Sequence, residues 1–106
     1  MNYNEQTAKE VESAVMQVFG CKLSTIVRCI DTHEKKVVIF ILSKLYDFDK
    51  RNLAVAYSTV YLYVPTIVSE IEDQFILNPE LRNKIIQVTK IIGYASTMDQ
   101  RRIAIA

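Results

Sequence analysis

The sequence predicts an all-α fold, a bundle of five or six helices. Three observations lead to this class. Apolar residues recur every three or four positions along most of the chain, which is the spacing of one helix face. Polar residues typical of helix caps stand before several of these stripes. The chain contains only two glycines and two prolines, too few for the many tight turns of a β-sandwich or barrel.

The length and composition predict a single domain over residues 1–106. A chain of 106 residues falls within the usual size of one domain, and a hydrophobic content of 50% supplies enough side chains for one core. No repeat or linker divides it. Residues 96–106 show no regular pattern, so we expect this tail to fray.

The first part of the chain predicts two helices. Thr7 and Glu10 have the spacing of a capping box, in which each side chain bonds the backbone N–H of the other residue. The apolar stripe that follows runs to Phe19, and Gly20 is suited to the left-handed conformation that ends a helix. Ser24 is expected to cap a short second helix.

A central helix is predicted next. Asp31 and Glu34 again have capping-box spacing, and residues 37–42 are apolar on every side. The alternative is a buried strand over residues 37–42, since β-branched residues are frequent there. Together with a strand over residues 59–64, this alternative would make the domain α+β.

The second half of the chain carries the clearest cap signals. Asp49 precedes a short amphipathic segment, and Asn78 followed by Pro79 is typical of a helix start. The last helix is predicted to run from there towards Gly93. Residues 58–68, with the sequence STVYLYVPTIV, lack any charge and resemble a strand in composition.

The sequence predicts neither an enzyme nor a cofactor or metal site. The glycines stand too far apart for a phosphate-binding loop, and His33 is the single histidine. Cys21 and Cys29 are eight positions apart, without the ligand spacing of a zinc site. Both are expected to be buried thiols in a reducing compartment.

No membrane or export segment is expected. The longest apolar run, residues 37–42, is too short to cross a bilayer, and the first ten residues lack the features of a signal peptide. The chain is therefore predicted to be cytoplasmic.

Residues 50–75 have the size of a helix-turn-helix unit. Three stretches of the chain resemble the C-terminal DNA-binding domain of the bacterial chromosomal replication initiator DnaA family. They are VFGCKLSTIV (residues 18–27), KKVVIFILSKLYDFDKRNLAVAYS (35–58) and IEDQFILNPELRNKI (71–85). The resemblance lies in the order and spacing of core and cap positions. It implies a Trp repressor-like helical bundle that binds double-stranded DNA in DNA replication.

This resemblance implies candidate DNA contacts. Because the net charge is only +1, a basic footprint would have to be local. The candidates for reading bases are Tyr61, Tyr63, Thr66 and Ser69. The candidates for phosphate contact are Arg28, Lys35, Lys36, Lys44, Lys50 and Arg51.

The chain departs from the family at the positions that read DNA. The family has the polar sequence GGRDHTTV between its two key helices, where this chain has STVYLYV. A basic pair of the family is replaced by Ser69 and Glu70. The alternative function is therefore a helical protein-interaction module, a homodimer among the options, that has kept the fold and lost DNA reading.

Two outcomes are open for Tyr61, Leu62 and Tyr63. If they are exposed, they suit a protein partner or a second copy of the chain, since tyrosine is enriched at such surfaces. If at least two are buried, as large apolar side chains usually are, the recognition helix would start at Pro65 after an extended segment.

Overall fold

The computed structural model describes residues 4–27 and 32–93, and every regular element within them is helical. The elements are α1 (Glu5–Phe19), α2 (Leu23–Ile26), α3 (His33–Tyr46), α4 (Lys50–Ala56), the 3-10 helix η1 (Tyr61–Tyr63), α5 (Val64–Leu77) and α6 (Pro79–Ile91). The all-α prediction is confirmed, and the strands considered for residues 37–42 and 59–64 do not form.

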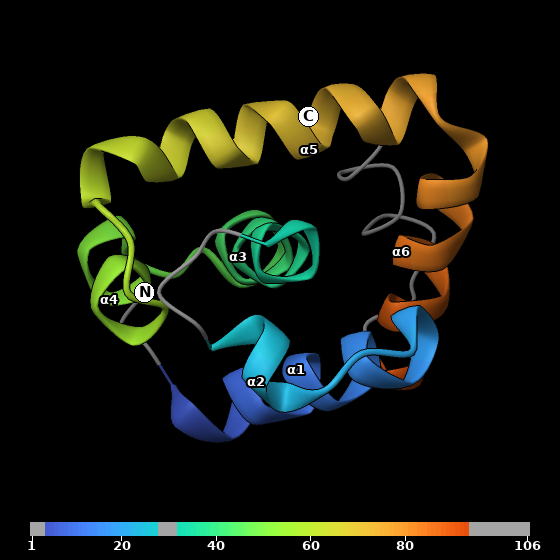
Figure 1. Ribbon diagram of the computed structural model, residues 1–106, viewed down its shortest axis with the longest axis horizontal. Helices are drawn as coiled ribbons and strands as arrows, with labels where there is room; N and C mark the ends of the chain where they lie inside the picture. The colour runs from blue at the N-terminus through green and yellow to red at the C-terminus, as the bar shows by residue number, and fades with distance from the viewer. Residues whose placement is uncertain (1–3, 28–31, 94–106) are drawn as a thin grey trace.

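Helix α3 is the centre of the molecule. Figure 1 views it end-on, with α5 above it, α6 at the right, α1 and α2 below and α4 at the left. Neighbours on several sides explain why residues 37–42 are all buried, each with 0% exposure. A helix in this position needs apolar residues around its whole circumference, which is the pattern that the sequence shows.

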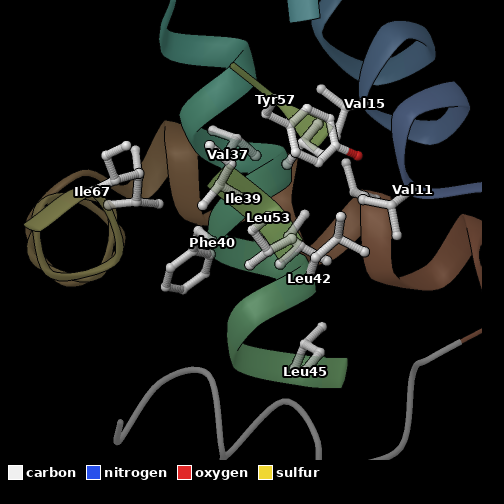
Figure 2. Close-up of a cluster of buried hydrophobic side chains, with 14 of the residues drawn as sticks. Val11, Val15, Val37, Ile39, Phe40, Leu42, Leu45, Leu53, Tyr57 and Ile67 are labelled. Atoms are coloured by element: carbon white, nitrogen blue, oxygen red, sulfur yellow. The ribbon is translucent and has the colours of Figure 1, made fainter. Parts of the chain in front are cut away.

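The core joins side chains of α3 to side chains from the five other α-helices, and Figure 2 shows a part of this cluster. The tyrosine ring of Tyr57, just after α4, reaches towards α1 in this view. The labelled members are Val11 and Val15 of α1, Val37, Ile39, Phe40, Leu42 and Leu45 of α3, Leu53 and Tyr57 at α4, and Ile67 of α5.

Three of the predicted helix ends are confirmed. The Asp49 carboxylate accepts a hydrogen bond from the backbone N–H of Arg51 at 2.8 Å. The Asn78 side chain accepts from the N–H groups of Glu80 (3.0 Å) and Leu81 (3.2 Å). Gly20 ends α1 in the left-handed conformation, with φ of 68°. Each of these signals acts within one turn of the chain, which is why the sequence alone reveals it.

The predicted cap of α1 is wrong. Asn4 caps the helix by accepting from the N–H of Thr7 at 3.1 Å, so Thr7 lies inside the first turn. Both Asn4 and Thr7 are followed by a polar residue at the third position, Thr7 and Glu10 respectively. A start of α1 at Glu5, after Asn4, gives the helix almost one more turn of backbone hydrogen bonds than a start after Thr7 would.

The predicted starts of α2 and α3 also change. Thr32 caps α3 by accepting from the N–H of Lys35 at 3.2 Å, while Asp31 lies outside the described residues. Lys22 stands at the N-cap of α2 without a side-chain hydrogen bond, so Ser24 is not its cap. Ser24 instead lies within the single turn of α2.

Candidate functional site

The chain changes conformation three times between α4 and α5. Ser58 takes the left-handed conformation (φ of 54°), and Val60 is extended. Residues 61–63 then form η1, which is closed by a hydrogen bond from the N–H of Tyr63 to the carbonyl of Val60 at 2.9 Å. Helix α5 follows directly, with Pro65 in its first turn, where a proline costs no hydrogen bond.

This segment leaves its large side chains exposed. Leu62 is 71% exposed, and Tyr61 and Tyr63 are also at the surface. Burial of two of these three residues, the opposing prediction, is therefore wrong. The inward positions are filled by Val64 and Ile67, which are fully buried and leave no core space for the residues of η1.

Two valines extend the exposed cluster. Val55 of α4 is 83% exposed, and Val60 precedes η1. Val55, Val60 and Tyr61 line one shallow depression with Arg51. The turn surface is defined as Val55, Val60, Tyr61, Leu62 and Tyr63.

A buried hydrogen bond ties the base of the turn surface to the rest of the fold. The Tyr57 hydroxyl donates to the Glu12 carboxylate of α1 at 2.5 Å, and both side chains are buried. The chain therefore leaves α4 at an anchored residue, immediately before the turn begins. The turn surface therefore lies between two buried residues, Tyr57 before it and Val64 after it.

Two cations border the turn surface. Lys50 and Arg51 are exposed at the start of α4. The Arg51 guanidinium lies over the Tyr61 ring, 5.0 Å from its centroid, which is a cation–π distance. This contact joins the start of α4 to η1 and combines positive charge with the apolar cluster.

Lys35 and Arg28 do not add to this basic edge. The Lys35 side chain has 0% exposure, which puts its ammonium group out of reach of a phosphate backbone and corrects its place among the phosphate candidates. Its position in the first turn of α3 faces the interior. Arg28 lies outside the described residues.

Lys36 and Lys44 are paired with carboxylates of α5. The ammonium of Lys36 lies 3.1 Å from the Glu70 carboxylate, and that of Lys44 lies 2.8 Å from Glu72. Both lysines are largely covered. They join α3 to α5, so a phosphate would have to compete with an existing carboxylate partner for either of them.

The outer face of α5 runs on from the turn surface. It consists of Pro65, Thr66, Ser69, Asp73 and Ile76, all exposed. Four of them, with Glu70, line a second shallow depression. Thr66 and Ser69 are accessible, as base reading would require, but the neighbouring Asp73 repels phosphate.

Sequence reasoning missed several exposed apolar residues, among them Val55, Ile76 and Leu77 near the turn surface and on α5. A signal was present for each. Val55 lies between the core positions Leu53 and Tyr57, and Ile76 and Leu77 follow the last core residue of the α5 stripe. Apolar residues that fall off the core stripe of an amphipathic helix are candidates for a binding surface.

Cys21 and His33 are the cysteine and the histidine that lie in the described part of the chain. Cys21 is half-buried, and burial together with the nearby Glu34 raises the pKa of its thiol, which lowers its thiolate fraction at neutral pH. The His33 ring hydrogen-bonds the Gln74 side chain at 3.1 Å. No group of three potential metal ligands gathers among the residues that the structure describes. Nor is any helix in that part of the chain long and apolar enough to span a bilayer.

Comparison with known proteins returned no match to a protein family, to a curated protein or to a solved structure. The fold and site therefore define a small all-α domain with an exposed apolar turn. The resemblance to the replication initiator domain stays a prediction.

Proposed function

We propose that this chain is a protein-binding helical module. Its contact surface is the turn surface, continued by the outer face of α5. The single observation that carries this function is the exposure of five neighbouring apolar or aromatic side chains on an anchored base. Covering a Val or Leu side chain contributes about 1.5–3 kcal/mol, so a partner gains most by covering this region.

The chemistry of the surface suits a protein partner. Tyr61 and Tyr63 offer large rings with few rotatable bonds and a hydroxyl at the rim, a combination enriched at protein interfaces. Arg51, stacked on Tyr61, is of the residue type most often found beside such rings. A partner with an apolar centre and an acidic border would complement this arrangement.

A photo-crosslinking experiment tests this function. Leu62 is replaced by the photoreactive residue p-benzoylphenylalanine in the cells that natively produce the chain, and Gln17, exposed on α1, is replaced in the same way as the control. We expect a discrete protein adduct from position 62 and none from position 17. Adducts of equal yield at both positions, or an adduct to nucleic acid alone, would contradict the proposal.

Binding to double-stranded DNA is the second candidate. Helix α4, the turn and α5 follow one another in the order of a helix-turn-helix, and Lys50 and Arg51 remain exposed beside the turn. Contacts to two phosphates would give weak binding with a log–log salt slope of about −1.8, at about −0.9 per phosphate. The carboxylates of Glu70, Glu72 and Asp73 on α5 would repel the DNA phosphates and so weaken this binding.

Mobility-shift measurements on duplex DNA decide the second candidate. DNA binding predicts a shift at low salt that disappears at moderate salt and in the double variant Lys50→Glu, Arg51→Glu. The control variant Lys9→Glu, Lys22→Glu makes the same charge change on α1 and before α2, across α3 from α5 (Figure 1), and should keep the shift. Absence of a shift at low salt excludes this function.

A further inference from the structure

Exposed apolar residues of η1 and α5 stand symmetrically about Ser69 in the sequence. Leu62 and Ile76 each stand seven residues from Ser69, on opposite sides of it. Ser69 and Ile76 are both in α5, where seven residues make about two turns, or about 10 Å, so they fall on one stripe. Leu62 lies in η1, which leads directly into α5 with Tyr63 and Val64 already in the right-handed helical region, so Leu62 extends the row of side chains beyond the N-terminal end of α5. Leu62 and Ile76 are 71% and 52% exposed, and between them Thr66 and Ser69 are small and polar.

We propose that this chain forms a symmetric dimer in which two α5 helices pack antiparallel and cross at Ser69. This inference rests on the proposed protein-binding function and names a second copy of the chain as the partner. A two-fold axis at Ser69 places Leu62 of each copy against Ile76 of the other. One apolar contact is thereby formed twice, as an isologous interface requires.

The shape of the face fits this crossing. Pro65, Thr66, Ser69, Glu70 and Asp73 line a shallow depression along α5. Helices pack closely, about 8–10 Å apart, where the side chains at the crossing are small, and Thr66 and Ser69 meet that condition. The larger apolar side chains lie at the two ends, where they can interdigitate.

The charges favour the antiparallel direction. Arg51 lies over Tyr61, so Lys50 and Arg51 border the N-terminal end of α5. Asp73, which is exposed, lies about 14 Å further along the helix, at about 1.5 Å per residue from Val64, whereas Glu70 on the same half is already paired with Lys36. An antiparallel pair brings the basic end of each copy to the acidic half of the other, whereas a parallel pair would place like charges together.

Sedimentation equilibrium on the full chain, with charge-swap variants, tests the dimer. We expect a concentration-dependent mass that rises towards twice that of one chain. Arg51→Asp and Asp73→Arg should each raise the dimer dissociation constant by about tenfold or more, and the double variant should recover most of that loss. The control Lys22→Asp, before α2, should leave it unchanged.

Disulfide trapping tests the position of the axis. In a chain with Cys21→Ser and Cys29→Ser, the variant Ser69→Cys should form an intermolecular disulfide much faster than Ser13→Cys on α1, because a two-fold axis brings the two Ser69 positions together. Circular dichroism of each variant checks that the helices are retained. Equal rates for the two variants would overturn the crossing at Ser69.

The outcomes separate this dimer from the proposed function. A chain that stays monomeric at all concentrations overturns the dimer. If position 62 still crosslinks to a different protein, the binding function stands and the partner is not a second copy. If neither a dimer nor a protein adduct forms, both inferences fall. A dimer that Asp73→Arg does not weaken overturns the antiparallel arrangement.

Discussion

At the scale of single residues, one buried hydrogen bond, between Tyr57 and Glu12, lies directly before the exposed turn between α4 and α5. Tyr57 and Glu12 are separated by 45 positions in the sequence, yet their hydrogen bond joins the end of α4 to α1. Both are buried, so the Glu12 carboxylate depends on this hydroxyl to offset the loss of its water. Ser58 to Tyr63 follow Tyr57 directly in the chain, so this hydrogen bond fixes the point at which the turn begins.

We expect Tyr57→Phe to lower the free energy of unfolding by about 1–3 kcal/mol, because it removes the hydroxyl and leaves a buried carboxylate without that donor. Urea denaturation followed by circular dichroism measures the change. Tyr63→Phe, which removes the same atom at an exposed position, is the control and should change stability by less than about 0.5 kcal/mol. A loss of less than about 0.5 kcal/mol in Tyr57→Phe would contradict a stabilising role of the Tyr57 hydroxyl.

At the scale of elements, α5 separates three roles around its circumference. Val64, Ile67, Ile71 and Phe75 face the core. Glu70 and Glu72 lie at the flanks and pair with lysines of α3, and the outer face remains accessible. Helix α6 then begins at a cap and not by continuation of α5, since Asn78 is extended (φ of −118°, ψ of 102°) and Pro79 follows it.

We expect Asn78→Ala to destabilise the fold by about 1 kcal/mol, because two backbone N–H groups at the start of α6 lose their acceptor. Asn78→Asp should keep most of the stability, since a carboxylate accepts the same bonds. Asn83→Ala, at an exposed position inside α6, is the matched control and should be neutral or slightly stabilising. The midpoint of urea unfolding reports all three, and a neutral Asn78→Ala would argue against this cap.

At the scale of the whole molecule, the residues that form the core differ from the residues that form the proposed binding surface. The core surrounds α3, whereas the turn surface and the outer face of α5 lie at the periphery (Figure 1). A domain of this size has a total stability of about 5–15 kcal/mol, so the loss of one large core side chain is a substantial fraction of it. Removal of an exposed apolar side chain removes no such packing.

We expect Phe40→Ala to destabilise the domain by about 3–5 kcal/mol, because it leaves a cavity beside the central helix. Leu62→Ala should change the stability of the monomer by less than about 0.5 kcal/mol, while it weakens the protein contact. Thermal unfolding at low protein concentration measures the first effect, and crosslinking or sedimentation measures the second. A large loss of monomer stability in Leu62→Ala would mean that this residue belongs to the core.

The sequence by itself determined the helical class, the apolar circumference of α3 and the ends of the helices at Gly20, Asp49 and Asn78. These features arise from residues within one or two turns of each other, where spacing and side-chain chemistry are sufficient. The strand-like composition of residues 58–68 supported only the α+β alternative, in which residues 59–64 form a strand. That strand does not form, because β-branched and aromatic residues also suit a buried helix face and an exposed turn.

Only the tertiary structure decided which of the candidate contact residues are exposed and unoccupied by other partners, and so can bind DNA or a protein. Lys36 and Glu70 are 34 positions apart, and their pairing follows from how α3 packs on α5. The burial of Lys35 and the exposure of Leu62 likewise depend on which neighbours surround each position. Side-chain exposure and ion pairing depend on how segments that are distant in the sequence pack together. Local sequence patterns carry little information about that packing.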